Sequence, residues 1–151
     1  MEKDFLTSLI NLFDRELTTL EKEINLYPSE ETLWKLSGEI KNTAGNLCLH
    51  LCGNLQHFIG TVLGHTGYVR NRDHEFTARN ITRDQLIREI QNTKKVVHST
   101  LAKLEESTLQ KEYPLQTLGY PMTTSYFLLH LYGHFTYHLG QINYHRRLIA
   151  A

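Results

Sequence analysis

Apolar residues recur every three or four positions through most of this chain, which is the spacing of one face of an α-helix. The first such stripe runs from Phe5 to Ile24, and charged residues occupy the rest of that helical surface. No segment shows the alternation of apolar and polar residues that is typical of a half-buried strand. The sequence therefore predicts an all-α fold.

Turn-forming residues divide this pattern into four helices. Pro28 ends the first helix, and a polar connection over 29–41 leaves room for a short helical turn around Trp34. Thr82 and Gln85 have the spacing of a capping box, and Thr123 or Thr124 can cap the last helix. The predicted helices span about 5–24, 42–64, 83–108 and 124–148.

The connection over 65–81 constrains the topology. Seventeen extended residues at roughly 3.3 Å each can run the full length of a helix of about 23 residues, which rises about 1.5 Å per residue. The second and third helices can therefore be parallel. We predict a four-helix bundle in up-down-down-up order, with a long crossover between helices two and three, in a single domain over 1–151.

Charge and cysteine content exclude several classes of protein. Sixteen basic and sixteen acidic residues cancel, which argues against nucleic acid as a partner. No apolar run is long enough to cross a membrane, and the first residues lack the pattern of a secretory signal. Cys48 and Cys52 are predicted to be free thiols in the core, which favours a cytoplasmic location.

Two of the predicted helices carry a narrow polar strip on an otherwise apolar surface. At 100° per residue, Asn46, Asn54, His57 and Thr61 fall close to His50 on the second helix. On the last helix one face holds His130, His134, His138, Gln141 and His145. Buried polar groups cost about 1–3 kcal/mol each when unpaired, so the two strips predict a polar cavity between these helices.

Three histidines in these strips predict a metal site. His134 and His138 are one helical turn apart, so their imidazoles can converge on one ion, and His50 is the candidate third ligand. Three neutral imidazoles leave a coordination position open, with zinc or nickel as the expected ion and iron(II) also allowed. Asn54 and Gln141 are expected to hydrogen-bond to the ligands.

Other interpretations of the histidines stay open at this point. His130 is an alternative ligand, paired with His134, and a metal-free hydrogen-bond network is also possible. The remaining histidines are expected on the surface or in loops, without assigned chemistry: 57, 65, 74, 98 and 145. Glycines seven residues apart in both helices, at 53 and 60 and at 133 and 140, predict a close approach of another helix.

Three segments resemble the DinB/YfiT-like superfamily of four-helix metal-binding proteins. They are Asn-Leu-Cys-Leu-His-Leu-Cys-Gly-Asn-Leu over 46–55, Arg-Asn-Arg-Asp-His-Glu-Phe over 70–76, and His134-x-x-x-His138-x-Gly140-Gln141. The resemblance covers most of the chain. It implies an up-down-down-up bundle, metal ligation by His50, His134 and His138, and a homodimer.

The resemblance also implies a function. Some members of this superfamily are metal-dependent transferases that join a low-molecular-weight thiol to an electrophile, in detoxification or stress response, and others have no assigned activity. The rival expectation is a non-catalytic, metal-stabilised dimeric interaction or stress protein. No further catalytic residue is identified. Arg70, Arg72, Arg146 or Arg147 could bind carboxylates of such a thiol. Asp73 and Glu75, beside Arg70 and Arg72, are expected to pin the crossover by ion pairs.

Overall fold

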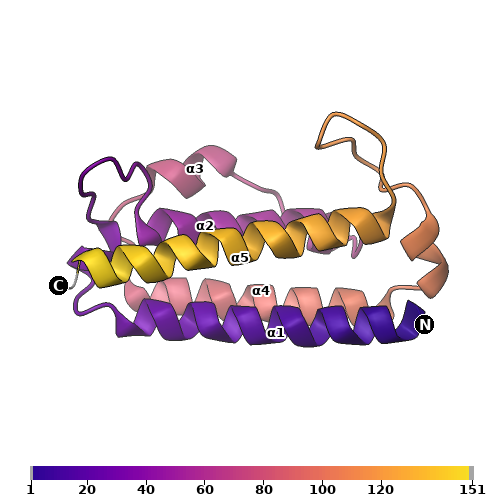
Figure 1. Cartoon of the computed structure of the whole chain (residues 1–151), viewed down its shortest axis with the longest axis horizontal. Coiled ribbons are helices and arrows are strands. Elements are labelled where there is room, and N and C mark those ends of the chain that lie inside the picture. Colours follow the sequence, from indigo (N-terminus) through magenta and orange to yellow (C-terminus); the bar gives the residue numbers. More distant parts are fainter. Residues whose placement is uncertain (1, 150–151) are drawn as a thin grey trace.

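Four long helices lie side by side and form the body of the protein (Figure 1). The computed structural model describes residues 2–149, and within them there is no strand, so the all-α prediction is confirmed. The long helices are α1 (Glu2–Leu26), α2 (Ala44–Leu55), α4 (Arg83–Lys103) and α5 (Thr124–Ile149). Shorter elements are 3-10 turns at Glu31–Trp34 and Glu106–Gln110, a π-helical segment at Gln56–Thr61 and the helix α3 (Arg72–Thr77).

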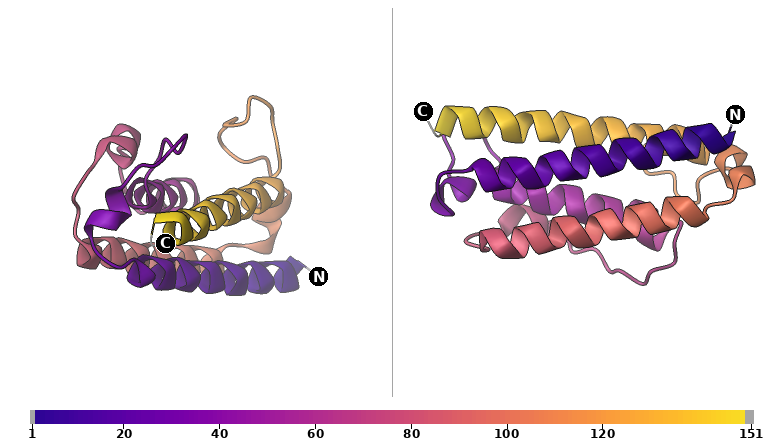
Figure 2. Two further views of the ribbon diagram at one scale, coloured as in Figure 1. Left: turned by 60° about the vertical axis from the view of Figure 1, so that its left-hand side comes forward. Right: turned by 90° about the horizontal axis from the view of Figure 1, so that it is seen from below.

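The helices follow the predicted up-down-down-up order. In Figure 1, α1 runs from right to left, α2 and α4 both run from left to right, and α5 returns to the left. The crossover between α2 and α4 therefore runs back along the bundle, and it carries α3 on the outer side of α2. Helices α1 and α2 each contact both α4 and α5, and the views in Figure 2 show the same arrangement.

The ends of the helices depend on specific capping groups. The Thr43 side chain accepts a hydrogen bond from the backbone N–H of Asn46 and begins α2. Thr82 and Gln85 form the predicted capping box at the start of α4. Helix α4 ends at Lys103, five residues before the predicted end, because the chain becomes extended at Leu104 and then forms the 3-10 turn that packs against α1 and α5.

The core lies where the four helices meet. Phe13, Leu17, Leu20 and Ile24 are fully buried along one face of α1, as its periodicity predicts. Cys48 and Cys52 are free and buried, in agreement with the sequence prediction. No helix within residues 2–149 is long and apolar enough to cross a membrane.

His145 is buried, and its prediction as a surface or loop residue was wrong. Its Nε2 lies 2.7 Å from the carbonyl oxygen of Lys35 and its Nδ1 lies 2.7 Å from the Tyr27 hydroxyl. A carbonyl only accepts, so Nε2 carries the proton, and Nδ1 shares the single hydroxyl proton of Tyr27 with the carbonyl oxygen of Ile142, which lies 3.0 Å from that hydroxyl. The connection after α1 folds over the C-terminal end of α5, where His145 lies. A helical wheel relates residues of one helix only, so it could not predict the contact between His145 and this connection.

We expect His145→Ala to lower the free energy of unfolding by about 2–4 kcal/mol, since it leaves a cavity in place of a buried ring and removes that ring's hydrogen bonds to Lys35 and Tyr27. Urea unfolding followed by circular dichroism measures this change. His98→Ala is the matched control: His98 is exposed and contacts Asp14, and its loss should cost about 1 kcal/mol or less. Equal effects of the two substitutions would contradict this role of His145.

Candidate metal centre

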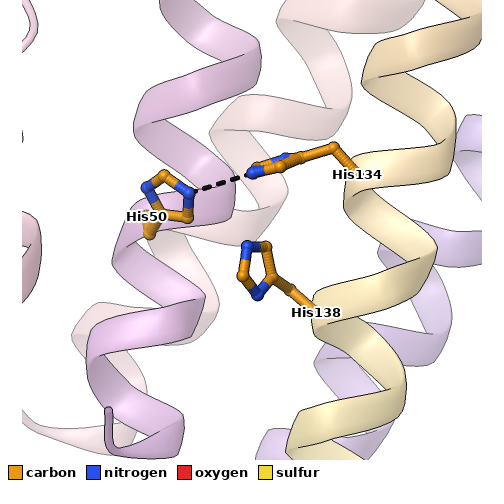
Figure 3. Close-up of side chains that lie close together, drawn as sticks. All are labelled: His50, His134 and His138. Carbon is orange, nitrogen blue, oxygen red and sulfur yellow. Dashed lines mark hydrogen bonds between the residues drawn. The ribbon is translucent and has the colours of Figure 1, made fainter. Parts of the chain in front are cut away.

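The imidazole rings of His50, His134 and His138 converge between α2 and α5 (Figure 3). His50 projects from α2, and the other two project from successive turns of α5. One nitrogen of each ring lies within 4.8 Å of the corresponding nitrogens of the others. Nε2 of His50 and Nε2 of His134 are 3.1 Å apart. The structure thus brings together the three residues that the sequence singled out as ligands.

The donor set fits a divalent transition metal. Two nitrogens bound at about 2.0–2.1 Å to a tetrahedral ion lie about 3.3 Å apart, which is close to the 3.1 Å between the His50 and His134 nitrogens. Imidazole suits zinc, nickel, copper and iron, whereas calcium and magnesium require oxygen ligands. The three histidines could therefore hold a metal ion of the transition series.

Hydrogen bonds fix the tautomers of two of these rings. The Nδ1 of His50 lies 3.0 Å from a carboxylate oxygen of Glu75, and the Nδ1 of His138 lies 2.7 Å from the amide oxygen of Gln141. Both oxygens accept, so each Nδ1 carries a proton, and in the neutral imidazole the lone pair is then on Nε2. This is the protonation pattern that a metal-binding imidazole needs.

Glu75 also anchors the crossover to the bundle. Its side chain is buried and accepts hydrogen bonds of 2.9 Å from both Nε and Nη2 of Arg70. Burial opposes ionisation of this carboxyl group, but the hydrogen bonds from His50 and Arg70 and the Arg70 charge lower its pKa below the ordinary value. Asp73, which was expected to share this task, is exposed.

The sequence reasoning missed that Glu75 is the hydrogen-bonding partner of His50. A helical wheel relates residues of one helix, and these two belong to different segments. One signal was available: Gly53 lies one turn from His50, and the structure shows that a Cβ at Gly53 would collide with the Glu75 carboxylate. The predicted close approach at Gly53 is therefore made by a side chain of α3.

Burial keeps the two histidines of α5 in the form that can bind metal. Desolvation, aided by the nearby His138, His50, His130 and Arg70, lowers the pKa of His134 to about 4. Desolvation also lowers the pKa of His138, against an opposing effect of its hydrogen bond to Gln141. Both rings are therefore neutral at pH 7.

The other predicted polar residues occupy different positions. Asn54 is buried, and its Oδ1 has no hydrogen-bond partner among the described residues. His130 is exposed and stacks on Phe127, with its ring centre 6.4 Å from that of His134, so it stands outside the cluster. His57 is half-buried and lies in the π-helical segment that follows α2. The wider turns of this segment break the helical periodicity, so the polar strip predicted on the second helix does not continue past residue 55.

The comparisons with known proteins identify the family. The family model described as "Protein of unknown function (DUF1572)" matches residues 1–151. The chain belongs to the DUF1572 family. The crystal structure of a DinB-like protein from Bacillus cereus is similar, with a TM-score of 0.75 and 16% sequence identity over 98% of this chain and 92% of that chain. This likeness confirms the DinB-like helical-bundle fold. The comparison with curated proteins gave no match.

A cavity of about 400 Å³ opens beside the three histidines in this DUF1572 protein. Aromatic rings form much of its wall, and the guanidinium of Arg72 lies over one of them, 5.3 Å from the ring centre of Phe76. Asn54 also lines the cavity. The cluster is thus accessible to a small molecule of partly apolar character. The aromatic lining residues are Phe58, Phe76 and Phe127.

We expect Gly53→Ala to weaken zinc binding by this DUF1572 protein by about 10–100-fold, the range found when the hydrogen-bonding partner of a metal ligand is lost. The added methyl group would push the Glu75 carboxylate away from His50. A competition titration against a chromophoric chelator measures the change. Gly133→Ala is the control for zinc affinity, since a Cβ there meets no atom within 4 Å among the described residues of the same chain. Unchanged affinity in Gly53→Ala would contradict the role given to Glu75.

Proposed function

We propose that this protein is a metal-dependent transferase that joins a low-molecular-weight thiol to an electrophile, in detoxification or stress response. His50, His134 and His138 would hold one divalent ion, with zinc or nickel as the expected metals. The observation that carries the proposal is the convergence of three imidazole nitrogens within 4.8 Å of one another. The resemblance to the DinB/YfiT-like superfamily supports the choice of reaction.

The ligand count favours catalysis over a closed structural site. Structural zinc sites generally use four protein ligands, whereas catalytic sites use three and keep a position for a small molecule. When bound here, the metal would lower the pKa of a coordinating thiol and stabilise it as the nucleophilic thiolate. Glu75 and Gln141 hold two of the ligand rings in the required tautomer and orientation.

The cavity wall supplies the other requirements of such a reaction. Phe58, Phe76 and Phe127 limit the access of water and offer apolar surface to an electrophile. Arg70 is held by Glu75, whereas Arg72 lies over Phe76 at the cavity, where its guanidinium could bind a carboxylate of the thiol. Arg72 is therefore our candidate for orienting an anionic thiol.

A substrate screen tests this proposal. Protein without a histidine tag is loaded with zinc or nickel and mixed with several cellular thiols and a fluorogenic electrophile. We expect conjugate formation above the spontaneous rate, its loss on chelation, and its recovery when the metal is restored. His130→Ala should retain the activity. No conjugate with any tested thiol would reject the transferase assignment.

A second candidate is a non-catalytic protein in which the metal is structural. It is favoured by the placement of His50 on α2 and of the other two ligands on α5, since one ion would then link two helices. This reading predicts a metal-dependent rise in melting temperature, a fall in melting temperature in His50→Ala and no conjugate with any thiol. Both candidates fit a reducing cytoplasm, where Cys48 and Cys52 stay free.

A further inference from the structure

The outward face of α5 carries a row of exposed apolar side chains. In Figure 1 α5 lies in front of α2, and within residues 2–149 no other helix crosses its outer side. Large apolar residues on a helix surface are ordinarily isolated, whereas here they recur every three or four residues along the whole helix. We name this row the outer stripe; its members are Tyr126 (50% exposed), Leu129 (53%), Gly133, Tyr137 (65%), Gly140, Tyr144 (65%) and Leu148 (64%).

Helix α5 also carries no charge before its last turn, where Arg146 and Arg147 lie. The 22 residues from 124 to 145 contain no Asp, Glu, Lys or Arg. A surface helix ordinarily carries charged and polar residues on its solvent-facing side, whereas this one exposes tyrosines and leucines there. Gly133 and Gly140 support the same conclusion. Each costs the helix about 1 kcal/mol relative to alanine, yet a Cβ at either position meets nothing within 4 Å among the described residues of this chain. The sequence predicted a close approach of another helix at both glycines, and the described part of this chain does not supply it.

The order of residues in the outer stripe identifies the partner. Positions at nearly equal distances before and after Tyr137 hold residues that can pack together: Gly133 with Gly140, Leu129 with Tyr144, and Tyr126 with Leu148. An antiparallel copy of the same helix, related by a two-fold axis near Tyr137, would make each of these contacts twice. We propose that the outer stripe is the homodimer interface and that α5 packs antiparallel against α5 of a second copy.

The exposed area is sufficient for this assembly. A buried tyrosine covers about 150–250 Å², so at the exposed fractions given above the five large side chains offer on the order of 600 Å² per copy. Two copies would bury about 1,200 Å², the lower limit for stable interfaces, before the flanking residues are counted. The glycines allow the two backbones to approach closely. The absence of charge from 124 to 145 removes like-charge repulsion between identical faces.

The proposed interface adjoins the candidate metal centre without including its ligands. Tyr137, at the predicted two-fold axis, contacts His138 edge-on, with ring centres 5.3 Å apart. The guanidinium of Arg147 lies over the Tyr144 ring, 5.2 Å from its centre, near one end of the stripe. The dimer goes beyond the proposed function and does not depend on metal binding, so the two can fail separately.

Sedimentation equilibrium tests the interface. We expect a wild-type dimer, and at least a 100-fold rise in the dissociation constant for Leu129→Glu and for Tyr144→Glu, because each would bury unpaired carboxylates at two symmetric contacts. Leu26→Glu, at a leucine of α1 that is 48% exposed, is the matched control and should remain dimeric. Circular dichroism confirms that the variants keep their helices.

Three results would overturn the proposal. The first is a monomeric wild-type protein. The second is a dimer whose dissociation constant is unchanged in both Leu129→Glu and Tyr144→Glu. The third is an equal rise in the dissociation constant in the control Leu26→Glu. A monomeric wild type that sediments with phospholipid vesicles would assign the stripe to a membrane surface instead.

Cross-linking tests the register independently of any disruptive variant. In the antiparallel arrangement, Tyr137→Cys should give a covalent dimer with a short bismaleimide. Tyr126→Cys should cross-link only when mixed with Leu148→Cys, while the buried Cys48 and Cys52 stay unreactive. Efficient cross-linking of Tyr126→Cys alone would indicate a parallel pair and contradict the two-fold axis near Tyr137.

Discussion

Replacing His138 by alanine is expected to lower zinc affinity by at least about 100-fold while leaving the fold intact. The substitution removes one of three ligands, which should exceed the 10–100-fold loss that follows when a hydrogen-bonding partner of a ligand is removed. His138 is half-buried at the cavity, so its loss should cost little unfolding free energy. A competition titration gives the affinity, and thermal unfolding of the metal-free protein checks the fold.

His130→Ala is the matched control for this result. His130 lies on the same helix two turns before His138, and its ring stacks on Phe127 outside the cluster. Zinc affinity should therefore change less than about threefold. If His130→Ala abolished binding and His138→Ala left it unchanged, the alternative pair of His130 and His134 would be the site, and the ligand set proposed here would be wrong.

Glu75→Gln should lower both stability and metal affinity. The neutral amide leaves the Arg70 charge without its buried counterion, and we expect a loss of about 3 kcal/mol in unfolding free energy. His50 also loses its carboxylate partner, so zinc affinity should fall about 10–100-fold. Because folding lowers the pKa of Glu75, its contribution is present above the unfolded-state pKa and is lost as the pH falls. The free energy of unfolding of Glu75→Gln should therefore fall less than that of the wild type as the pH is lowered into the acid range.

Glu23→Gln separates the two effects. Glu23 pairs with Arg146 away from the histidine cluster, and it is buried in a similar way. Its replacement should lower unfolding free energy and leave zinc affinity unchanged. Urea unfolding and chelator competition on both variants provide the comparison. If zinc affinity fell in both variants in proportion to their loss of unfolding free energy, Glu75 would have no specific effect on His50.

The fold was largely predictable because local patterns and chain length both constrain it. The apolar stripe from Phe5 to Ile24 and the capping box at Thr82 determine helices through contacts within a few residues. The seventeen residues of the crossover can span a helix, which allowed the parallel pair that the structure shows. The end of α4 was placed too late, because the turn at Leu104 depends on packing of the following 3-10 segment against α1 and α5.

The candidate site was predictable only as far as helical geometry reaches. The spacing of His134 and His138 follows from one helix, and His50 was inferred from a second polar strip. His145 shared the face of these ligands on the wheel, yet its contact with Tyr27 comes from a connection that folds over the end of the bundle. The role of Glu75 in pinning the crossover was predicted, but its hydrogen bond to His50 was not. That contact joins two segments of the chain that no helical periodicity relates.

Metal analysis tests the central claim most directly. Protein expressed without a histidine tag is measured by inductively coupled plasma mass spectrometry as purified and after dialysis against zinc or nickel, with the His50→Ala/His138→Ala double variant beside it. The three-histidine centre predicts close to one transition-metal ion per wild-type chain and almost none in the double variant. Less than a tenth of an equivalent in the wild type, with no uptake of either metal, would contradict it.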